Sequence, residues 1–159
     1  MKKMLIGLGN PIVGDDRIGL AVMEELLPLV KPDIKTLKGA FPAFALMEAM
    51  LDMDEVYIVD AIFGDQPGEV IETPLAELSI HAQMESMHRT NLYGAVKAGK
   101  RLGLNLPERI QVLGIKIEPA YEFTEQFTPP IQEAFPRIIQ RIKDLLTEYQ
   151  YLNHDTAEK

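Results

Sequence analysis

Hydrophobic residues recur along the chain in two patterns, compact runs and helical repeats. Compact apolar runs predict strands, and the run at 56–62 is the clearest because β-branched and aromatic residues predominate in it. The predicted strands are residues 3–8, 34–37, 56–62, 69–72 and 110–117. The predicted helices are residues 16–30, 43–51, 89–102 and a last amphipathic helix through Ile138, Ile142, Leu145 and Tyr149, with Pro136 in or before its first turn. Residues 73–87 are poorly patterned and predict a long, partly irregular excursion.

The alternation of strands and helices predicts an α/β fold with a mostly parallel sheet covered by helices on both faces. The turn between the runs 56–62 and 69–72 is too short for a helical crossover, so we expect these strands to pair as a hairpin and the sheet to be mixed. The length and the even spread of Gly and Pro (11 each) predict one domain over residues 1–151. Residues 152–159 form a polar tail that we expect to be frayed.

Composition and charge exclude several classes of function. The chain has no cysteine, which removes disulfides, thiolate metal sites and cysteine nucleophiles. A net charge of −8 argues against nucleic-acid binding, because such proteins usually present a basic face to the phosphates. The first apolar run is too short for a signal peptide, and no stretch reaches the length of a membrane span. We therefore expect a cytoplasmic monomer that does not bind membranes.

Polar candidates fall at the edge of the sheet where open α/β folds bind ligands, beyond the carboxyl ends of the strands. Asp15 and Asp16 follow the first strand and its loop, Asp60 lies near the end of the most apolar strand, and His88 stands just before or at the start of the third helix. A carboxylate such as Asp60 is costly to bury unless it is paired, protonated or bound to a cation. Structural roles are the alternative: backbone hydrogen bonds for Asp60, helix capping for Asp15 and Asp16, and packing for His88. A functional site therefore requires these side chains to converge.

Two common motifs do not fit the sequence. A dinucleotide-binding fingerprint over residues 7–14 needs a third glycine at position 12, which is Ile12, and Pro11 has no N–H to offer a phosphate. The serines Ser79 and Ser86 do not lie in a Gly-x-Ser-x-Gly elbow, so a serine hydrolase of that kind is not indicated.

A motif rich in glycine and aspartate follows the first strand, with the pattern Gly7-x-Gly9-Asn10-Pro11-x-x-Gly14-Asp15-Asp16-x-Ile18-Gly19. Further segments are Val59-Asp60-Ala61 after a hydrophobic strand, Ser86-x-His88 before a helix, Glu118-Pro119 after the last strand and Thr128-Pro129 before the last helix. Together they resemble the hydrogenase maturation protease family. The resemblance implies a three-layer α/β/α sandwich around a twisted, mostly parallel five-stranded sheet.

The same resemblance implies a reaction and a set of site residues. Members of the family are endopeptidases that remove the C-terminal extension from the large-subunit precursor of a nickel-iron hydrogenase after nickel insertion. By position, Asp16, Asp60 and His88 match the family's three metal-contacting residues, and we expect them to be catalytic and metal-binding here. Two carboxylates and an imidazole are acceptable ligands for Ni(II). We expect the precursor to carry the nickel as a recognition element, with either the metal or an aspartate driving hydrolysis.

One position departs from the family pattern, and two other functions stay open. Lys38-Gly39-Ala40 stands where many members have Asp-Gly-Gly, so we expect a positive charge near the cleft to influence which precursor is accepted. A non-enzymatic, nickel-dependent chaperone or binding module of hydrogenase assembly would use the same residues. A peptidyl-tRNA hydrolase also opens with Gly-Leu-Gly-Asn-Pro, but it continues with a glycine and a catalytic histidine, whereas this chain has Ile12 and no histidine before His81.

Overall fold

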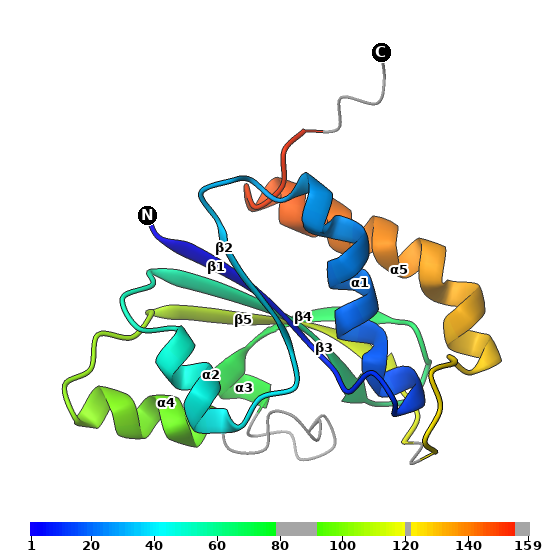
Figure 1. Ribbon diagram of the computed structural model, residues 1–159, viewed down its shortest axis with the longest axis horizontal. Helices are drawn as coiled ribbons and strands as arrows, with labels where there is room; N and C mark the ends of the chain where they lie inside the picture. The colour runs from blue at the N-terminus through cyan, green and yellow to red at the C-terminus, as the bar shows by residue number, and fades with distance from the viewer. Residues whose placement is uncertain (79–91, 120–121, 155–159) are drawn as a thin grey trace.

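The computed structural model describes residues 1–78, 92–119 and 122–154, and Figure 1 shows its strands gathered into one twisted sheet. The strands of the described residues lie in the order β2-β1-β3-β5-β4. Their bounds are β1 Lys3–Leu8, β2 Lys35–Gly39, β3 Glu55–Phe63, β4 Val70–Pro74 and β5 Arg109–Ile117. The pairings of β1, β2, β3 and β5 are parallel, and β4 is antiparallel to β5. The predicted mixed, mostly parallel five-stranded sheet is confirmed.

Helices cover both faces of the sheet, which confirms the predicted layers (Figure 1). The elements on one face are η1 (Gly14–Arg17) and η2 (Leu27–Leu29), two 3₁₀ turns, and the helices α1 (Ile18–Leu26) and α5 (Pro129–Glu148). The helices on the other face are α2 (Ala43–Ala49), α3 (Leu75–Leu78) and α4 (Leu92–Arg101). Within the part of the chain that the structure describes, no helix is both long enough and apolar enough to cross a membrane.

The period of two along β3 divides the hydrophobic core into two clusters. Tyr57 and Val59 pack with residues of α1 and α5, whereas Val56 and Ile58 pack with residues of α2 and α4. The strand is apolar on both faces because helices cover both. By the same alternation, Asp60 belongs to the face that carries α2 and α4.

The predicted hairpin between β3 and β4 is wrong, because β5 lies between them. β3 pairs with β5 along its whole length, and β4 pairs with the far side of β5. The longer, more apolar β5 gains more by lying beside the central strand, where both of its faces are covered. The shorter β4 carries Glu72 and Thr73, which suit an edge strand. Burial therefore outweighs closeness in sequence.

The last helix begins earlier than predicted. It starts at Pro129, and Pro136 lies inside it and not in or before its first turn. Pro129 and Pro130 fit the start of a helix, where backbone N–H groups have no intrahelical acceptor. The buried side chains of Ile131 and Ile138 anchor the helix on both sides of Pro136. This packing outweighs the hydrogen bond that Pro136 removes.

The predicted frayed tail is wrong at its first residue, Leu152, which is 1% exposed. Leu152 forms an antiparallel bridge with Val30, and the N–H of Asn153 donates to the carbonyl oxygen of Leu29 at 2.8 Å. The chain therefore stays attached to the domain through Asn153, because an apolar side chain at position 152 fills the core beside η2. Residues 155–159 of the predicted tail lie outside the described residues.

Candidate functional site

Glycines let the start of α1 reach the ends of two strands. A Cβ atom on Gly19 would lie 2.1 Å from the carbonyl oxygen of Leu8 and 2.5 Å from that of Val59. A Cβ atom on Gly9 would lie 2.6 Å from the carbonyl oxygen of Asp16. Real Cβ atoms do not approach an oxygen so closely, so only glycine permits this backbone packing. The glycine motif thereby positions η1 and its acidic residues at the carboxyl ends of β1 and β3.

Asp16 lies on η1 and is 5% exposed. Its Oδ2 accepts a hydrogen bond of 3.1 Å from the backbone N–H of Asn10, just beyond the end of β1. The N-cap residues of η1 and α1 are Val13 and Arg17, and neither helix has a side-chain cap. Neither Asp15 nor Asp16 is therefore a side-chain cap, although both lie in the first turn of η1, where acidic residues are favoured.

Asp15 joins η1 to the start of α5. It is buried, and its carboxylate oxygens accept hydrogen bonds from the backbone N–H and the hydroxyl of Thr128, at 2.8 and 2.7 Å. Thr128 is the N-cap residue of α5. The motif Thr128-Pro129 is visible in the sequence, but its partner is not, because the two residues are 113 positions apart. Asp15 therefore steadies the loop that carries Asp16.

Backbone pairing reinforces the same connection. Thr124 forms a parallel bridge with Val13: its N–H donates to the carbonyl of Ile12, and its carbonyl accepts from the N–H of Gly14, both at 2.8 Å. This loop pair, residues 12–14 and 123–124, joins the loop after β1 to the segment that leads into α5. The position of Asp16 thus depends on contacts that the N-terminal motif alone does not contain.

Asp60 is completely buried on β3. Its Oδ1 accepts a hydrogen bond of 2.8 Å from the backbone N–H of Ala61. In the pairing of β1 with β3, Gly7 lies opposite Val59, so Asp60 is level with Leu8, the last residue of β1. The prediction that Asp60 lies near the end of its strand holds relative to β1, but β3 itself continues three residues further, to Phe63.

Asp16 follows β1, and Asp60 on the neighbouring strand β3 is level with the end of β1, so both carboxylates lie toward the same edge of the sheet, where η1 contacts β3. The third predicted site residue, His88, lies outside the described residues. Within residues 1–78, 92–119 and 122–154, no group of three His, Cys, Asp or Glu side chains is arranged to hold a metal ion. The two carboxylates offer oxygen atoms that can contact a cation or accept a proton.

Lys38, the departure from the family pattern, directs its charge toward α1. Its Nζ lies 3.7 Å from Oε1 of Glu24, and both side chains are about half exposed, so this ion pair adds little stability. The neighbouring Leu37 packs in the cluster that includes α2 and α4. By alternation, Lys38 and Asp60 therefore face opposite sides of the sheet. The expected positive charge is not on the side of Asp60.

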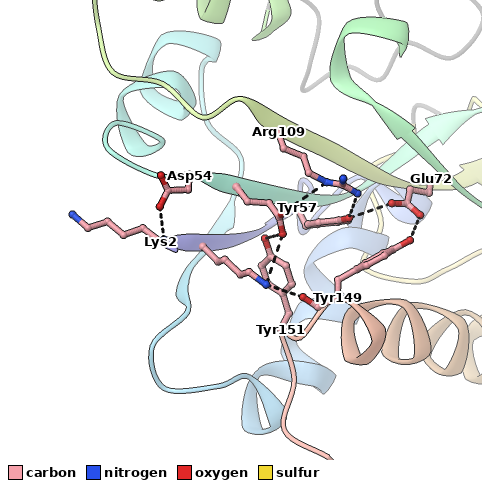
Figure 2. A network of polar contacts seen from close by, with 9 residues as sticks. Lys2, Asp54, Tyr57, Glu72, Arg109, Tyr149 and Tyr151 are labelled. Atoms are coloured by element: carbon pink, nitrogen blue, oxygen red, sulfur yellow. Dashed lines mark hydrogen bonds and ion pairs between the residues drawn. The ribbon is translucent and has the colours of Figure 1, made fainter.

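A different polar network lies toward the amino-terminal edge of the sheet (Figure 2). The hydroxyl of Tyr57 donates to Glu72 at 3.2 Å and accepts from Nη2 of Arg109 at 3.0 Å. The hydroxyl of Tyr149 donates to the other carboxylate oxygen of Glu72. The hydroxyl of Tyr151 donates to the carboxylate of Glu55 on β3. The members of this tyrosine network are Tyr57, Tyr149, Tyr151, Glu55, Glu72 and Arg109.

The contacts of Tyr151 complete the network. Its hydroxyl donates to Oε1 of Glu55 at 3.0 Å, and Nε of Arg109 lies 3.7 Å from Oε2 of the same carboxylate. The ring of Tyr57 stacks on that of Tyr149, with ring centres 5.0 Å apart. Sequence analysis missed this network, because two tyrosines after a helix and two glutamates in strands are unremarkable until the fold joins them.

The network raises the pKa values of its tyrosines. The hydrogen bond to Glu72, together with burial, raises the pKa of Tyr149 to about 12. Burial, with the charge of Glu55 nearby, raises the pKa of Tyr151. Burial also raises the pKa of Tyr57, although the hydrogen bond from Arg109 opposes it. These hydroxyls stay protonated at neutral pH and serve as donors to the two glutamates.

Comparison with known proteins adds a family to this geometry. The family model of hydrogenase maturation proteases matches residues 22–145, more than half of the chain. Protein FrxA of Pyrococcus furiosus is 28% identical over 146 residues, covering 86% of this chain and 98% of that protein. The Hydrogenase 2 maturation protease of Escherichia coli is 23% identical over 152 residues, covering 91% of this chain and 92% of that protein. The structure of the hydrogenase maturating endopeptidase HybD from E. coli is similar, with a TM-score of 0.76, 22% identity and 94% of each chain covered.

The structural likeness confirms the α/β fold, and the family model carries the assignment further. The matched range includes β3 with Asp60, and it begins after Asp16, whose assignment therefore rests on its own geometry. The match favours the maturation proteases over the peptidyl-tRNA hydrolases, which share only the opening Gly-Leu-Gly-Asn-Pro. This chain belongs to the hydrogenase maturation protease family.

Proposed function

We propose that this protein is an endopeptidase that removes the C-terminal extension from the large-subunit precursor of a nickel-iron hydrogenase after nickel insertion. Membership of the hydrogenase maturation protease family supports the class of reaction. The observation that carries the proposal is the completely buried carboxylate of Asp60 on the central strand, level with the end of the neighbouring strand β1, beyond which Asp16 lies. Buried carboxylates are costly, and this edge is where open α/β sheets bind ligands.

The metal in this proposal belongs to the substrate. The precursor holds the nickel, and Asp16 and Asp60 contact it together with His88, which lies outside the described residues. Carboxylate oxygens and an imidazole are ligands that Ni(II) accepts. A metal presented in this way marks a precursor that has already been loaded. The protein therefore cleaves after insertion and not before it.

Peptide hydrolysis requires a water molecule to lose a proton as it attacks the scissile carbonyl, and the leaving amine to gain one. Asp16 or Asp60 takes the proton from the water as a general base and returns it to the amine. Nickel next to the scissile bond draws electron density from the carbonyl. Two carboxylates at one edge suit this division, because one can contact the metal while the other handles the proton.

The test is mass spectrometry of a cognate large-subunit precursor incubated with the protein, with and without nickel loaded. We expect loss of one discrete C-terminal peptide from the nickel-loaded precursor alone. Cleavage of the nickel-loaded and the nickel-free precursor alike would show that nickel is not the recognition element. Metal-dependent binding without cleavage would favour a non-enzymatic chaperone of hydrogenase assembly. If the protein neither cleaves nor binds the precursor, the proposal is overturned.

A further inference from the structure

The loop pair exposes two large apolar side chains beside the candidate site. Ile12 is 48% exposed and Phe123 is 83% exposed, whereas Val13, next to Ile12 in the chain, is buried. Apolar groups in contact with water cost free energy, and where they gather they mark interaction surfaces. Ile12 and Phe123 are far apart in the sequence, so the tertiary fold brings them together.

Backbone pairing brings the two residues next to each other in the loop pair. Val13 is opposite Thr124 in the parallel bridge, and Thr124 bonds to the residues on both sides of Val13. Ile12 is therefore opposite Phe123. Both Ile12 and Phe123 are exposed, whereas the Val13 side chain between Ile12 and Gly14 is buried.

Hydrogen bonds connect this apolar pair to the candidate site. The loop that carries Ile12 continues directly into η1, where Asp15 is bonded to Thr128 and Asp16 to the N–H of Asn10. The pair is thus held against the loop of the candidate carboxylates by main-chain and side-chain bonds. A partner that covers the pair also reaches the edge of the sheet where Asp16 lies.

We propose that Ile12 and Phe123 form a docking surface for an apolar patch on the folded hydrogenase large-subunit precursor. This inference rests on the proposed function and extends it, because it assigns recognition to a surface beside the cleavage site and not to the extension peptide alone. A protease that reads whether nickel is in place must engage folded protein around the metal. A rigid apolar pair next to the candidate carboxylates suits that task, since aromatic and aliphatic anchors commonly dominate the binding energy of an interface.

A second copy of this chain is the alternative occupant of the surface. A stable interface buries about 1,200–2,000 Å² in total, and two side chains fall far short of that area by themselves. In docking to a precursor, by contrast, they are one part of an interface that continues into the candidate site. Continuity with that edge favours the precursor.

The experiment measures precursor cleavage and precursor binding for three variants against the unaltered protein. The double variant Ile12→Ser/Phe123→Ser removes the apolar pair, Phe123→Leu keeps it apolar, and Leu102→Ser is the matched control. Leu102 is 80% exposed but follows α4, away from the loop pair. We expect the double variant to raise KM for the nickel-loaded precursor about tenfold or more, with kcat little changed. Phe123→Leu should raise KM less than the double variant does, because the position stays apolar, and Leu102→Ser should leave KM unchanged.

Each outcome separates this inference from the proposed function. Cleavage by the unaltered protein with an unchanged KM for the double variant would overturn the docking surface and leave the protease function standing. Binding without cleavage, lost in the double variant, would retain the docking surface and refute the protease function. If the unaltered protein neither binds nor cleaves the precursor, the docking surface and the protease function are both overturned. Sedimentation completes the test: a dimer that the double variant abolishes would assign the surface to a second copy and overturn the inference.

Discussion

The two edges of the sheet both hold carboxylates, but at different depths and with different partners. At the carboxyl edge, Asp15, Asp16 and Asp60 are at most 5% exposed and accept hydrogen bonds from backbone N–H groups, with a threonine hydroxyl added at Asp15. At the amino edge, Glu55 is partly buried and Glu72 is exposed, and both accept hydrogen bonds from tyrosine hydroxyls (Figure 2).

This difference separates function from stability. Burying a carboxylate costs free energy; the hydrogen bonds from Thr128 offset this cost at Asp15, and we propose that a chemical role explains it at Asp16 and Asp60. The tyrosine network instead joins β3, β4 and β5 to the end of α5, segments that are far apart in the chain. We expect substitutions at the carboxyl edge to change cleavage, and substitutions at the amino edge to change the free energy of unfolding.

The largest expected effect is the loss of cleavage on replacing Asp60 by Asn. The amide oxygen can still accept the hydrogen bond from Ala61, so the fold should persist, whereas proton transfer and metal contact are impaired. We expect the cleavage rate to fall about 100- to 10,000-fold. Precursor cleavage and thermal melting measure the two effects. Glu72→Gln at the amino edge is the control, and normal cleavage by Asp60→Asn would remove that residue from the site.

A large loss of stability should follow Gly19→Ala. The new methyl group would collide with the carbonyl oxygens of Leu8 and Val59, so we expect the free energy of unfolding to fall by about 3 kcal/mol. Gly94→Ala is the matched control, because nothing lies within 4 Å of its added Cβ. In the helix α4 that change should stabilise the protein by about 0.5–1 kcal/mol. Urea unfolding measures the free energy of unfolding of both variants. Equal changes in Gly19→Ala and Gly94→Ala would refute the close approach of α1 to the strands.

Removing one hydroxyl group at each edge of the sheet compares the effects of the two edges on stability and on cleavage. Tyr151→Phe removes the donor to Glu55, and Thr128→Val removes a donor to Asp15. Each should lower the free energy of unfolding by about 1–3 kcal/mol, since a donor to a carboxylate is lost. Only Thr128→Val should also slow cleavage, because Asp15 steadies the loop of Asp16. Slower cleavage by Tyr151→Phe, at a temperature where it is fully folded, would contradict the separation of the edges.

The smallest effect is a loss of stability in alkali that belongs to the tyrosine network. Unfolded tyrosines ionise near pH 10, whereas Tyr149 has a pKa of about 12 in the folded protein. Because the folded pKa is raised, this stabilisation is complete below about pH 10 and is lost as the pH rises toward 12. Urea unfolding between these pH values should show the decline, and Tyr149→Phe should make it shallower. An unchanged slope in the variant would exclude Tyr149 as a contributor.

Much of the fold and part of the site follow from local patterns. The strand at 56–62 is apolar and β-branched in almost every position, and the structure has β3 there. Gly9 and Gly19, which stand before and after the acidic residues of the first motif, have a steric explanation that applies wherever a helix starts against a strand end. Asp60 could be found because an acidic residue inside an apolar strand conflicts with burial unless it has a purpose, whereas Asp16 is identified from its position in the family motif.

The sequence by itself determined the alternation of strands and helices, the sheet class and the presence of an acidic residue, Asp60, in the most apolar strand, because these depend on periodicity and on residue type. Only the tertiary structure decided that β5 separates β3 from β4, that Thr128 holds Asp15, and that Leu152 is anchored. The tyrosine network also belongs to this second group. Such pairings join residues far apart in the chain, and each depends on which competing contact buries more apolar surface or satisfies more polar groups, a comparison that no local pattern contains.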